Sequence, residues 1–175
     1  MKSTLTPVTA SDFIRAISRA ATPVTIVTTQ DGGRRLGQTV SALSRVSDEP
    51  AVLGVCINQR SPINEAIRAR GAFNISVLGS DHGAVADSFA GRDSVARPRF
   101  TFLDEEWRHG DNHLPVFNGS VAAFECELLN VTGIGSHHLY LGEVHRVAHT
   151  DVEPLLHLRG NYRTLAAHNT EGQHQ

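Results

Sequence analysis

A chain of 175 residues is long enough for one domain that buries roughly two-thirds of its unfolded surface, and we expect a single domain over 1–175 with a core over about 11–165 and a polar tail over 166–175. The 16 basic and 18 acidic residues give a net charge of −2 without a long block of like charge, which argues against nucleic acid or a membrane surface as a partner. No apolar run reaches the roughly 20 residues that span a bilayer, and the N-terminus lacks the apolar segment of a signal peptide, so the expected location is the cytoplasm.

The N-terminal segment predicts an amphipathic helix over 11–19. Phe13, Ile14 and Ile17 recur at helical spacing along one face. The first two residues of the segment are a serine and an aspartate, and either could cap the first turn. The helix is expected to end before Pro23, which cannot continue it.

The rest of the chain predicts strands with short helices between them. Runs rich in β-branched and apolar residues, bounded by glycine, proline or asparagine, are typical of strands. Ser61 and Pro62 open a helix, with serine as the cap and proline at the first helical position, and Gly71 closes it. A second short helix is expected over 83–89. The expected strands cover 24–29, 36–43, 51–57, 73–78, 121–131, 139–148 and 155–158.

The order of these elements favours a mainly β fold. About seven strands joined by short helices fit an antiparallel β-barrel with helical covers better than a doubly wound parallel sheet. The segment 91–115, which contains Trp107, is expected to form irregular cover for a pocket. Cys56 and Cys126 lie in apolar runs and are expected to be small buried residues, not disulfide partners.

The chain has ten histidines, and two pairs of them have the H-x-x-x-H spacing of some metal sites. His109 and His113 flank a loop-like segment without helical periodicity. His145 and His149 lie on an expected strand, where four residues at about 3.3 Å each separate them by roughly 13 Å, too far to share one ion. We therefore expect no metal site.

Polar residues cluster where the apolar strand 51–57 ends and the next helix begins. Asn58, Ser61 and Asn64 lie around this helix start, where unpaired backbone amides and the positive end of the helix dipole favour an anion. In the simpler alternative, Ser61 only caps the helix and Asn58 only closes a turn. The two motifs described next favour contact with a phosphate or a ribose.

Two segments resemble motifs of one enzyme family and occur in the same order. The first is Thr39-Val40-Ser41-Ala42, entered from Gly37 and followed by the strand 51–57 and by Asn58-Gln59-Arg60-Ser61. The second is Gly135-Ser136-His137-His138-Leu139-Tyr140, in which a small residue precedes a histidine at the start of a strand. Together they resemble the short flavin reductases that supply two-component monooxygenases, and in particular the reductase component of 4-hydroxyphenylacetate 3-monooxygenase.

The resemblance covers most of the chain, from Phe13 to about Leu165, and implies a fold, a cofactor and a reaction. The implied fold is an FMN-binding split β-barrel that forms homodimers, with the flavin in a groove near the interface. The implied reaction transfers a hydride from NADH or NADPH to FMN or FAD and releases the reduced flavin to a separate flavin-dependent monooxygenase. The residues implied to bind the flavin are Thr39, Val40, Ser41, Ala42, Cys56, Ile57, Asn58, Ser61, Asn64, Phe89 and Tyr162.

Three of the implied roles have simpler alternatives. His137 matches the histidine that the family holds beside the bound reductant, yet a histidine at a strand start is often an ordinary polar residue. If both histidines lie in the strand, His138 points to the opposite side, because side chains alternate. Tyr162 borders the flavin or the nicotinamide, or it packs the last strand with its hydroxyl satisfied. Phe89 forms the pocket rim, or it anchors the short helix to the core.

The absence of other catalytic motifs is compatible with flavin chemistry. The chain has no G-x-S-x-G elbow and no G-x-G-x-x-G fingerprint after a strand, and flavin reduction needs neither because the cofactor carries the chemistry. The alternatives are a reductase of another flavin-dependent substrate, such as a corrin, and a flavin-binding protein without turnover. The choice between FMN and FAD, and between NADH and NADPH, is left open.

Overall fold

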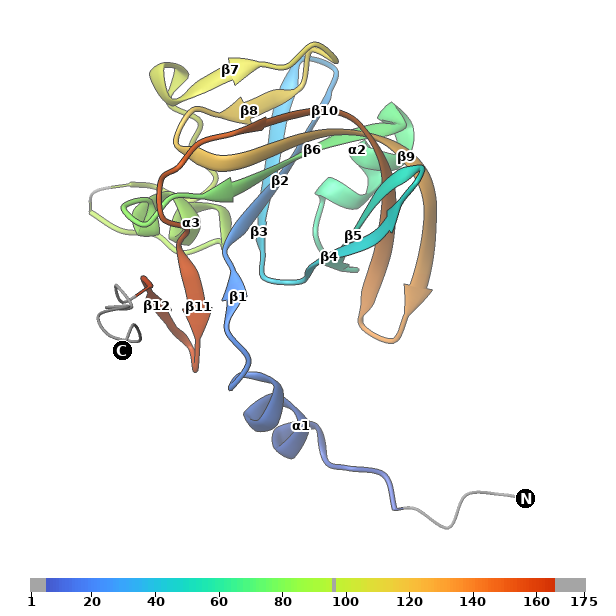
Figure 1. Cartoon of the computed structure of the whole chain (residues 1–175), viewed down its shortest axis with the longest axis vertical. Coiled ribbons are helices and arrows are strands. Elements are labelled where there is room, and N and C mark those ends of the chain that lie inside the picture. Colours follow the sequence, from blue (N-terminus) through green and yellow to red (C-terminus); the bar gives the residue numbers. More distant parts are fainter. Residues whose placement is uncertain (1–5, 96, 166–175) are drawn as a thin grey trace, which may run out of the picture.

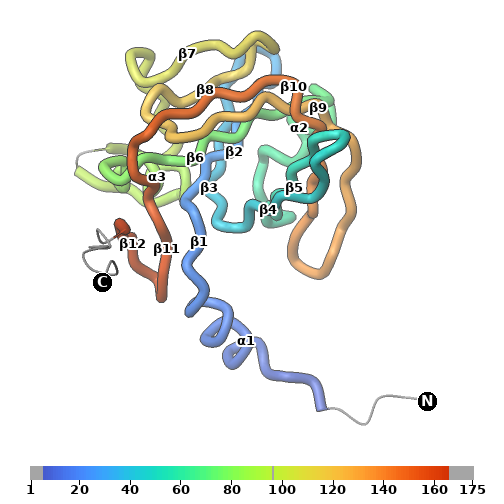
Figure 2. The backbone as a smooth tube through the Cα atoms, viewed as in Figure 1, coloured from blue at the N-terminus to red at the C-terminus, as the bar shows by residue number. Residues whose placement is uncertain are grey.

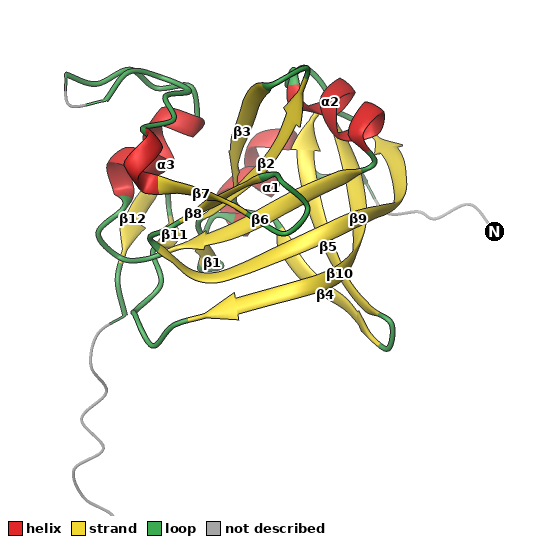
Figure 3. Ribbon diagram, turned by 90° about the horizontal axis from the view of Figure 1, so that it is seen from above, coloured by secondary structure: helices red, strands yellow, loops and turns green. Residues whose placement is uncertain are grey.

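The computed structural model describes residues 6–95 and 97–165, in which β-strands predominate (Figure 1). Seven strands pair antiparallel in the order β3-β2-β6-β9-β10-β5-β4, and this sheet curls into a barrel (Figure 3). The predicted mainly β, antiparallel barrel is confirmed. Its strands are β2 (Thr25–Asp31), β3 (Arg34–Val40), β4 (Leu43–Asp48), β5 (Ala51–Asn58), β6 (Ala72–Leu78), β9 (Ser120–Ile134) and β10 (His137–His149).

Two smaller sheets and three α-helices lie outside this sheet. The strands β1 (Thr22–Pro23), β11 (Leu156–Leu158) and β12 (Asn161–Arg163) form one sheet, and β7 (Trp107–His109) pairs with β8 (Pro115–Phe117). The helices are α1 (Ala10–Ile17), α2 (Ile63–Arg70) and α3 (Gly83–Phe89), with a 3₁₀ turn at Asp104–Glu106. Within the described ranges, no helix combines the length and apolarity needed to cross a bilayer.

The two edges of the seven-stranded sheet meet at a seam. β3 and β4 are the edge strands, and only Ser41 and Ala42 join the end of one to the start of the other. Strand pairing is therefore interrupted where the chain crosses from one edge to the other. The sequence predicted one strand over 36–43, which is wrong: β3 ends at Val40, and Leu43 already pairs with Val55 of β5.

The ends of two helices differ from the prediction. α1 is capped by Thr9, whose hydroxyl oxygen accepts a hydrogen bond from the Asp12 amide at 3.1 Å, so neither Ser11 nor Asp12 is the cap. α2 has Pro62 at its N-cap position and no side-chain cap, so Ser61 does not cap it. The predicted end is correct, because Gly71 takes the left-handed conformation at a φ of 68° that favours glycine.

The segment predicted to be irregular is partly ordered by an aromatic cluster. Trp107 opens β7 and pairs with Phe117 of β8, so the expectation of an irregular segment is wrong here. The Trp107 ring lies 4.7 Å from the Phe102 ring, 5.1 Å from the Phe117 ring and 5.3 Å from the Phe89 ring, measured between centroids. This cluster forms the core under α3, while a second core under α2 contains Ile63, Ile67, Phe73 and Tyr140.

Helix α1 stands apart from the barrel (Figures 1 and 2). None of its residues is buried, although it is amphipathic. Phe13, Ile14 and Ile17 remain 58%, 62% and 56% exposed. The helix therefore presents an apolar face that nothing in the described parts of the chain covers.

Candidate flavin site

The first predicted segment forms the seam of the barrel. Val40 is buried at the end of β3, while Ser41 and Ala42 are exposed. The Ala42 carbonyl accepts a hydrogen bond from the Cys56 amide at 3.3 Å, which holds the link against β5. The Thr39 hydroxyl donates to the Ala86 carbonyl of α3 at 2.7 Å, so its proton is used within the protein. At the seam, the Ser41 hydroxyl and the backbone groups of an edge strand are therefore available to bind a ligand.

Asn64 supports the loop before α2 and has no donor left for a ligand. Its side chain is 3% exposed, and its amide nitrogen donates to the carbonyls of Asn58 at 2.8 Å and Ser61 at 2.7 Å. Its side-chain oxygen accepts a hydrogen bond from the Tyr140 hydroxyl at 2.8 Å. The predicted direct contact of Asn64 with a phosphate does not fit this geometry, because a satisfied buried amide fixes the loop instead.

Ser61 and Asn58 lie on the accessible side of the same loop. The Ser61 hydroxyl donates to the side-chain oxygen of Gln38 at 2.8 Å, and Gln38 in turn donates to the Phe89 carbonyl at 3.2 Å. Gln38 therefore connects the start of α2 to the end of α3 across β3. Asn58 is exposed, and its side-chain oxygen accepts from the Arg60 amide at 2.9 Å. Gln38 was missed by the sequence reasoning, because no local pattern shows that it contacts Ser61, 23 residues away.

The second motif lies directly beside the first. In the ladder between β5 and β10, His137 pairs with Asn58, and the Gln59 amide donates to the Ser136 carbonyl at 3.0 Å. His137 is exposed, and its Nδ1 lies 2.8 Å from the Ser136 hydroxyl, which restrains the ring. His138 pairs with Ile57 and is half-buried. The fold therefore brings the two motifs together over a separation of about 80 residues in the sequence.

Phe89 anchors α3 to the core. Its side chain is fully buried, and its ring occupies the space where a side chain at Gly37 would otherwise lie. A β-carbon on Gly37 would stand 2.6 Å from the Phe89 ring. The geometry agrees with the core alternative for Phe89, and it explains why a glycine begins the first motif.

Tyr162 ties the last strand to α3. Its hydroxyl donates to Asp87 at 2.8 Å, and a β-carbon on Gly83 would lie 3.3 Å from its ring. This contact agrees with the packing alternative for Tyr162. Because α3 also holds Thr39, the tyrosine lies behind the seam with α3 between them.

Burial and the bond to Asp87 raise the pKa of Tyr162 to about 12. The folded state therefore holds this proton more tightly than the unfolded chain, in which tyrosine titrates near pH 10. The resulting stabilisation is fully present below about pH 10 and is lost as the pH rises toward 12. We expect the free energy of unfolding, measured in urea, to fall more steeply over this range for the wild type than for Tyr162→Phe. Equal pH slopes for the two proteins would contradict this assignment.

A cavity of about 340 Å³ lies along residues 34–38 of β3, beside Ser61 and the start of α2. The basic side chains of Arg34 and Arg35 lie at one end, and Gln38 and Ser61 lie toward the seam. Phe100 and Phe102 supply aromatic walls. A hydroxyl, two guanidinium groups and two rings fit a ligand that combines a flat ring with phosphate, as a flavin nucleotide does.

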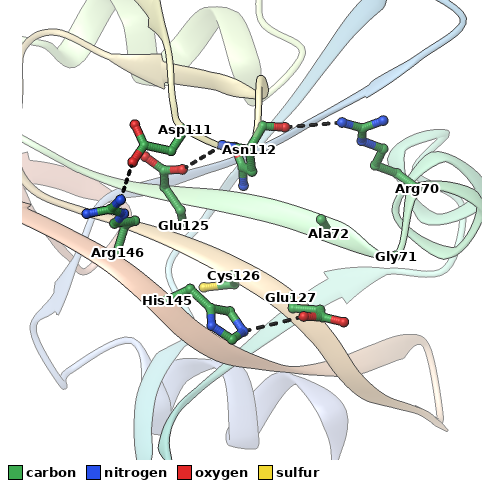
Figure 4. A pocket seen from close by; sticks show the side chains of 10 residues that line it. All are labelled: Arg70, Gly71, Ala72, Asp111, Asn112, Glu125, Cys126, Glu127, His145 and Arg146. Atoms are coloured by element: carbon green, nitrogen blue, oxygen red, sulfur yellow. Dashed lines mark hydrogen bonds and ion pairs between the residues drawn. The ribbon is translucent and has the colours of Figure 1, made fainter.

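A larger cavity, of about 520 Å³, lies elsewhere and has a different character (Figure 4). Its charged and polar side chains are bonded within the protein: Arg146 to Asp111 at 2.8 Å, His145 to Glu127 at 3.4 Å, and Arg70 and Glu125 to the backbone of Asn112. Burial raises the pKa of the Cys126 thiol at its wall to about 12, which keeps this cysteine protonated and unreactive at neutral pH. None of the residues predicted for the site lines this cavity, so the 340 Å³ cavity is the candidate.

Comparison with known proteins places the chain among flavin enzymes. Residues 17–166 match the family described as flavin reductase like domain. The chain belongs to this family. The FMN reductase (NADH) RutF 1 of Methylorubrum extorquens is 34% identical over 165 residues, which cover 94% of this chain and 81% of that protein. The resemblance inferred from the two motifs is therefore confirmed.

Two further relatives of this flavin reductase carry more detailed names. The 4-hydroxyphenylacetate 3-monooxygenase reductase component of Pseudomonas aeruginosa is 33% identical over 132 residues, covering 75% of this chain and 77% of that protein. The structure of the Streptomyces globisporus C-1027 NADH:FAD oxidoreductase SgcE6 in complex with NAD and FAD fragments has a TM-score of 0.80 and 27% identity. It covers 93% of this chain and 98% of the solved chain, so the fold is shared almost throughout.

Proposed function

We propose that this flavin reductase transfers a hydride from NADH or NADPH to FMN or FAD and supplies the reduced flavin to a separate flavin-dependent monooxygenase. The observation that carries the proposal is the ladder between β5 and β10, in which His137 pairs with Asn58. This ladder brings the two motifs side by side, which supports a single site that holds both the flavin and the reductant. The relatives named FMN reductase and NADH:FAD oxidoreductase support the same reaction.

The residues of the seam suit the demands of a flavin ring. A bound flavin supplies the electron-accepting ring, and its reduction leaves negative charge at the N1 and C2 carbonyl edge. The backbone N–H groups along Thr39 to Ala42 and the Ser41 hydroxyl stabilise charge at that edge. Val40 and Ile57 are buried in the core beneath the seam, whereas Cys56 points to the opposite face of β5 and is half-buried.

His137 and the loop before α2 serve the other two parts of the reaction. His137 is exposed, so a nicotinamide can reach its ring. The Ser136 hydroxyl, 2.8 Å from Nδ1, holds that ring in one orientation. Asn58 contacts the flavin phosphate through its side-chain amide nitrogen, and Ser61 does so when its hydroxyl proton turns from Gln38 to the phosphate, with the amides at the start of α2 supporting the charge. Asn64 holds this loop in shape.

Ser61→Ala is expected to raise the dissociation constant of FMN about 3- to 10-fold, or about 0.7–1.4 kcal/mol, because the bond that it makes to the phosphate replaces its bond to Gln38 and the net gain is that of an ordinary hydrogen bond. Riboflavin lacks the phosphate and is the control ligand, whose affinity is expected to change less than twofold. Titration of flavin fluorescence measures both constants. A parallel loss of riboflavin affinity would show that Ser61 acts on the ring and not on the phosphate.

The reaction itself is tested by anaerobic mixing of the purified protein with flavin and NADH. We expect the flavin absorbance near 450 nm to bleach, and the steady-state oxidation of NADH to depend on added FMN or FAD. Repeating the assay with NADPH decides the reductant. Flavin binding without bleaching by either nucleotide would favour a flavin-binding protein without turnover.

We also infer that the chain forms a homodimer and acts in the cytoplasm. The exposed apolar face of α1 supports the dimer, because exposed patches of this kind mark interaction surfaces and a second copy buries both faces at once. Light scattering is expected to give twice the chain mass, and the double variant Phe13→Ser with Ile17→Ser is expected to give a monomer. The use of reduced nicotinamide nucleotides supports the cytoplasm, and cell fractionation tests it.

A further inference from the structure

We propose that Tyr140 is a positioning residue, which holds the loop 58–61 and the start of β10 in a fixed relation to each other. The proposal rests on the proposed function and extends it, because it names a group that acts on both halves of the site without touching either ligand. Tyr140 is fully buried and lies on β10, three residues after His137. Its hydroxyl can therefore act on the site only through the residues to which it is bonded.

The ring of Tyr140 is an ordinary part of the core under α2. It packs edge-on against Phe73, with 6.4 Å between the ring centroids, and a phenylalanine would fill the same space. The hydroxyl is the part that a core aromatic does not need. Within the described ranges it donates to the side-chain oxygen of Asn64 at 2.8 Å and lies 3.4 Å from the Asn64 carbonyl. The hydroxyl of Tyr140 therefore serves Asn64 alone.

This hydrogen bond orients the Asn64 side chain. Burial raises the pKa of Tyr140 above the ordinary value of 10.0, so the hydroxyl keeps the proton that it donates at neutral pH. Asn64 is itself 3% exposed, and its amide group has one oxygen and one nitrogen on opposite sides. Because the oxygen is fixed by Tyr140, the nitrogen points away from β10 and toward the preceding loop.

The Asn64 nitrogen in turn holds the carbonyls of that loop. It lies 2.8 Å from the carbonyl oxygen of Asn58, 3.3 Å from that of Gln59 and 2.7 Å from that of Ser61. In a trans peptide the N–H points away from the C=O. Because the Asn58 carbonyl is turned toward Asn64, the Gln59 amide points to the other side. There it donates to the Ser136 carbonyl at 3.0 Å.

These hydrogen bonds form a closed ring. Ser136 immediately precedes β10, and Tyr140 follows four residues later on the same strand. The ring leaves β10 at Tyr140, passes through Asn64 and the peptide that joins Asn58 to Gln59, and returns to the chain at Ser136. It includes the loop proposed for the flavin phosphate and the residue before the proposed reductant histidine. Opening the ring at one bond is therefore expected to loosen both parts together.

The test removes the hydroxyl and follows both ligands. We expect Tyr140→Phe to raise the dissociation constant of FMN and the KM for the nicotinamide nucleotide, with riboflavin as acceptor, each about 3- to 10-fold. The dissociation constant of riboflavin is expected to change less than twofold, because the seam lies outside the ring of bonds. Ser61→Ala and His137→Ala are each expected to affect one ligand only. A joint change without a change for riboflavin is therefore the signature of positioning.

Tyr162→Phe is the matched control. It also removes a bonded tyrosine hydroxyl, but this one donates to Asp87 on α3, outside the ring of bonds. The dissociation constant of FMN and the KM for the nicotinamide nucleotide are expected to stay within twofold of the wild type in Tyr162→Phe. A joint increase in this control as large as that in Tyr140→Phe would overturn the proposal.

A double-mutant cycle shows whether Tyr140 acts through Asn64. Asn64→Ala is expected to give the same joint increase for FMN and the nicotinamide nucleotide. Adding Tyr140→Phe to Asn64→Ala is expected to cause no further increase, because the hydroxyl then has no side chain to orient. Additive increases in the cycle, or a riboflavin constant that rises as much as the FMN constant, would overturn the proposal.

Amide hydrogen exchange provides a readout that needs no ligand. In the flavin-free protein, the Gln59 amide is expected to exchange about 5-fold faster in Tyr140→Phe than in the wild type or in Tyr162→Phe. An unchanged exchange rate at Gln59 would overturn the proposal. Faster exchange with unchanged constants for FMN and the nicotinamide nucleotide would retain the hold of Tyr140 on the loop and contradict the ligand contacts of the proposed function instead. The two failures are therefore distinguishable.

Discussion

His137→Ala is expected to lower kcat/KM for the nicotinamide nucleotide about 10- to 100-fold while the dissociation constant of the flavin changes less than twofold. This 10- to 100-fold fall in kcat/KM is what the loss of one hydrogen bond to a charged group is expected to cost, at about 1.5–3 kcal/mol. The effect is confined to the reductant because the ring of His137 is exposed at the start of β10, next to Asn58 but outside the seam. Stopped-flow reduction of bound flavin at several NADH concentrations separates binding from the chemical step.

A matched control lies on the same strand. His145 is another exposed histidine of β10, and it lies beside Glu127 in the 520 Å³ cavity. His145→Ala is expected to leave both the reduction rate and the flavin affinity unchanged. Wild-type kinetics in His137→Ala would remove this residue from the site, and a loss of flavin affinity as large as the loss in kcat/KM would assign it to the flavin instead.

Gly37→Ala is expected to destabilise the protein by about 2–3 kcal/mol, because the new methyl group is forced against the fully buried ring of Phe89. Its β-carbon would lie 2.6 Å from the Phe89 ring. That ring cannot move aside easily, since it is fully buried and packed against Phe102 and Trp107. For a chain of this length the loss corresponds to a fall in Tm of roughly 4–12 °C, measured by calorimetry in the absence of flavin.

A double-mutant cycle identifies the clash as the cause. Phe89→Leu alone is expected to destabilise the protein, yet combining it with Gly37→Ala is expected to cost less than the sum of the two single changes. Gly133→Ala is the control, because a β-carbon there has no neighbour closer than 3.6 Å and the substitution is expected to cost little. Strict additivity in the cycle would show that the clash with Phe89 is not the cause of the destabilisation.

The sequence predicted those parts of the fold that depend on local patterns. All the strands of the barrel except β4 follow from runs of β-branched and apolar residues, and the end of α2 follows from Gly71, which tolerates a positive φ of 68°. The boundary between β3 and β4 was missed, because Ser41 and Ala42 interrupt no hydrophobic period. Their role as a link is visible only once the sheet has closed and its two edges are known.

The candidate site was predictable as a set of motifs but not as a set of contacts. The resemblance identified Asn58 and His137, and the fold pairs them directly. It did not reveal that the side-chain oxygen of Asn64 accepts a hydrogen bond from the Tyr140 hydroxyl, because these residues are 76 positions apart. Nor did any sequence pattern assign Arg34 to a cavity, since placing a single arginine requires the positions of Ser61 and Phe100.

The interrupted pairing at Ser41 and Ala42 also determines how tightly the unliganded barrel is closed. Elsewhere in the sheet, neighbouring strands are held together by a ladder of hydrogen bonds, whereas β3 and β4 are joined only by the link Ser41-Ala42, which the Cys56 amide ties to β5. If the flavin binds at this link as proposed, it contacts both edge strands and holds them together while it is bound. Amide hydrogen exchange around Ser41 and Ala42 is therefore expected to slow when flavin binds and to recover when flavin dissociates. The protein would then release reduced flavin by a local opening at this link, without global unfolding.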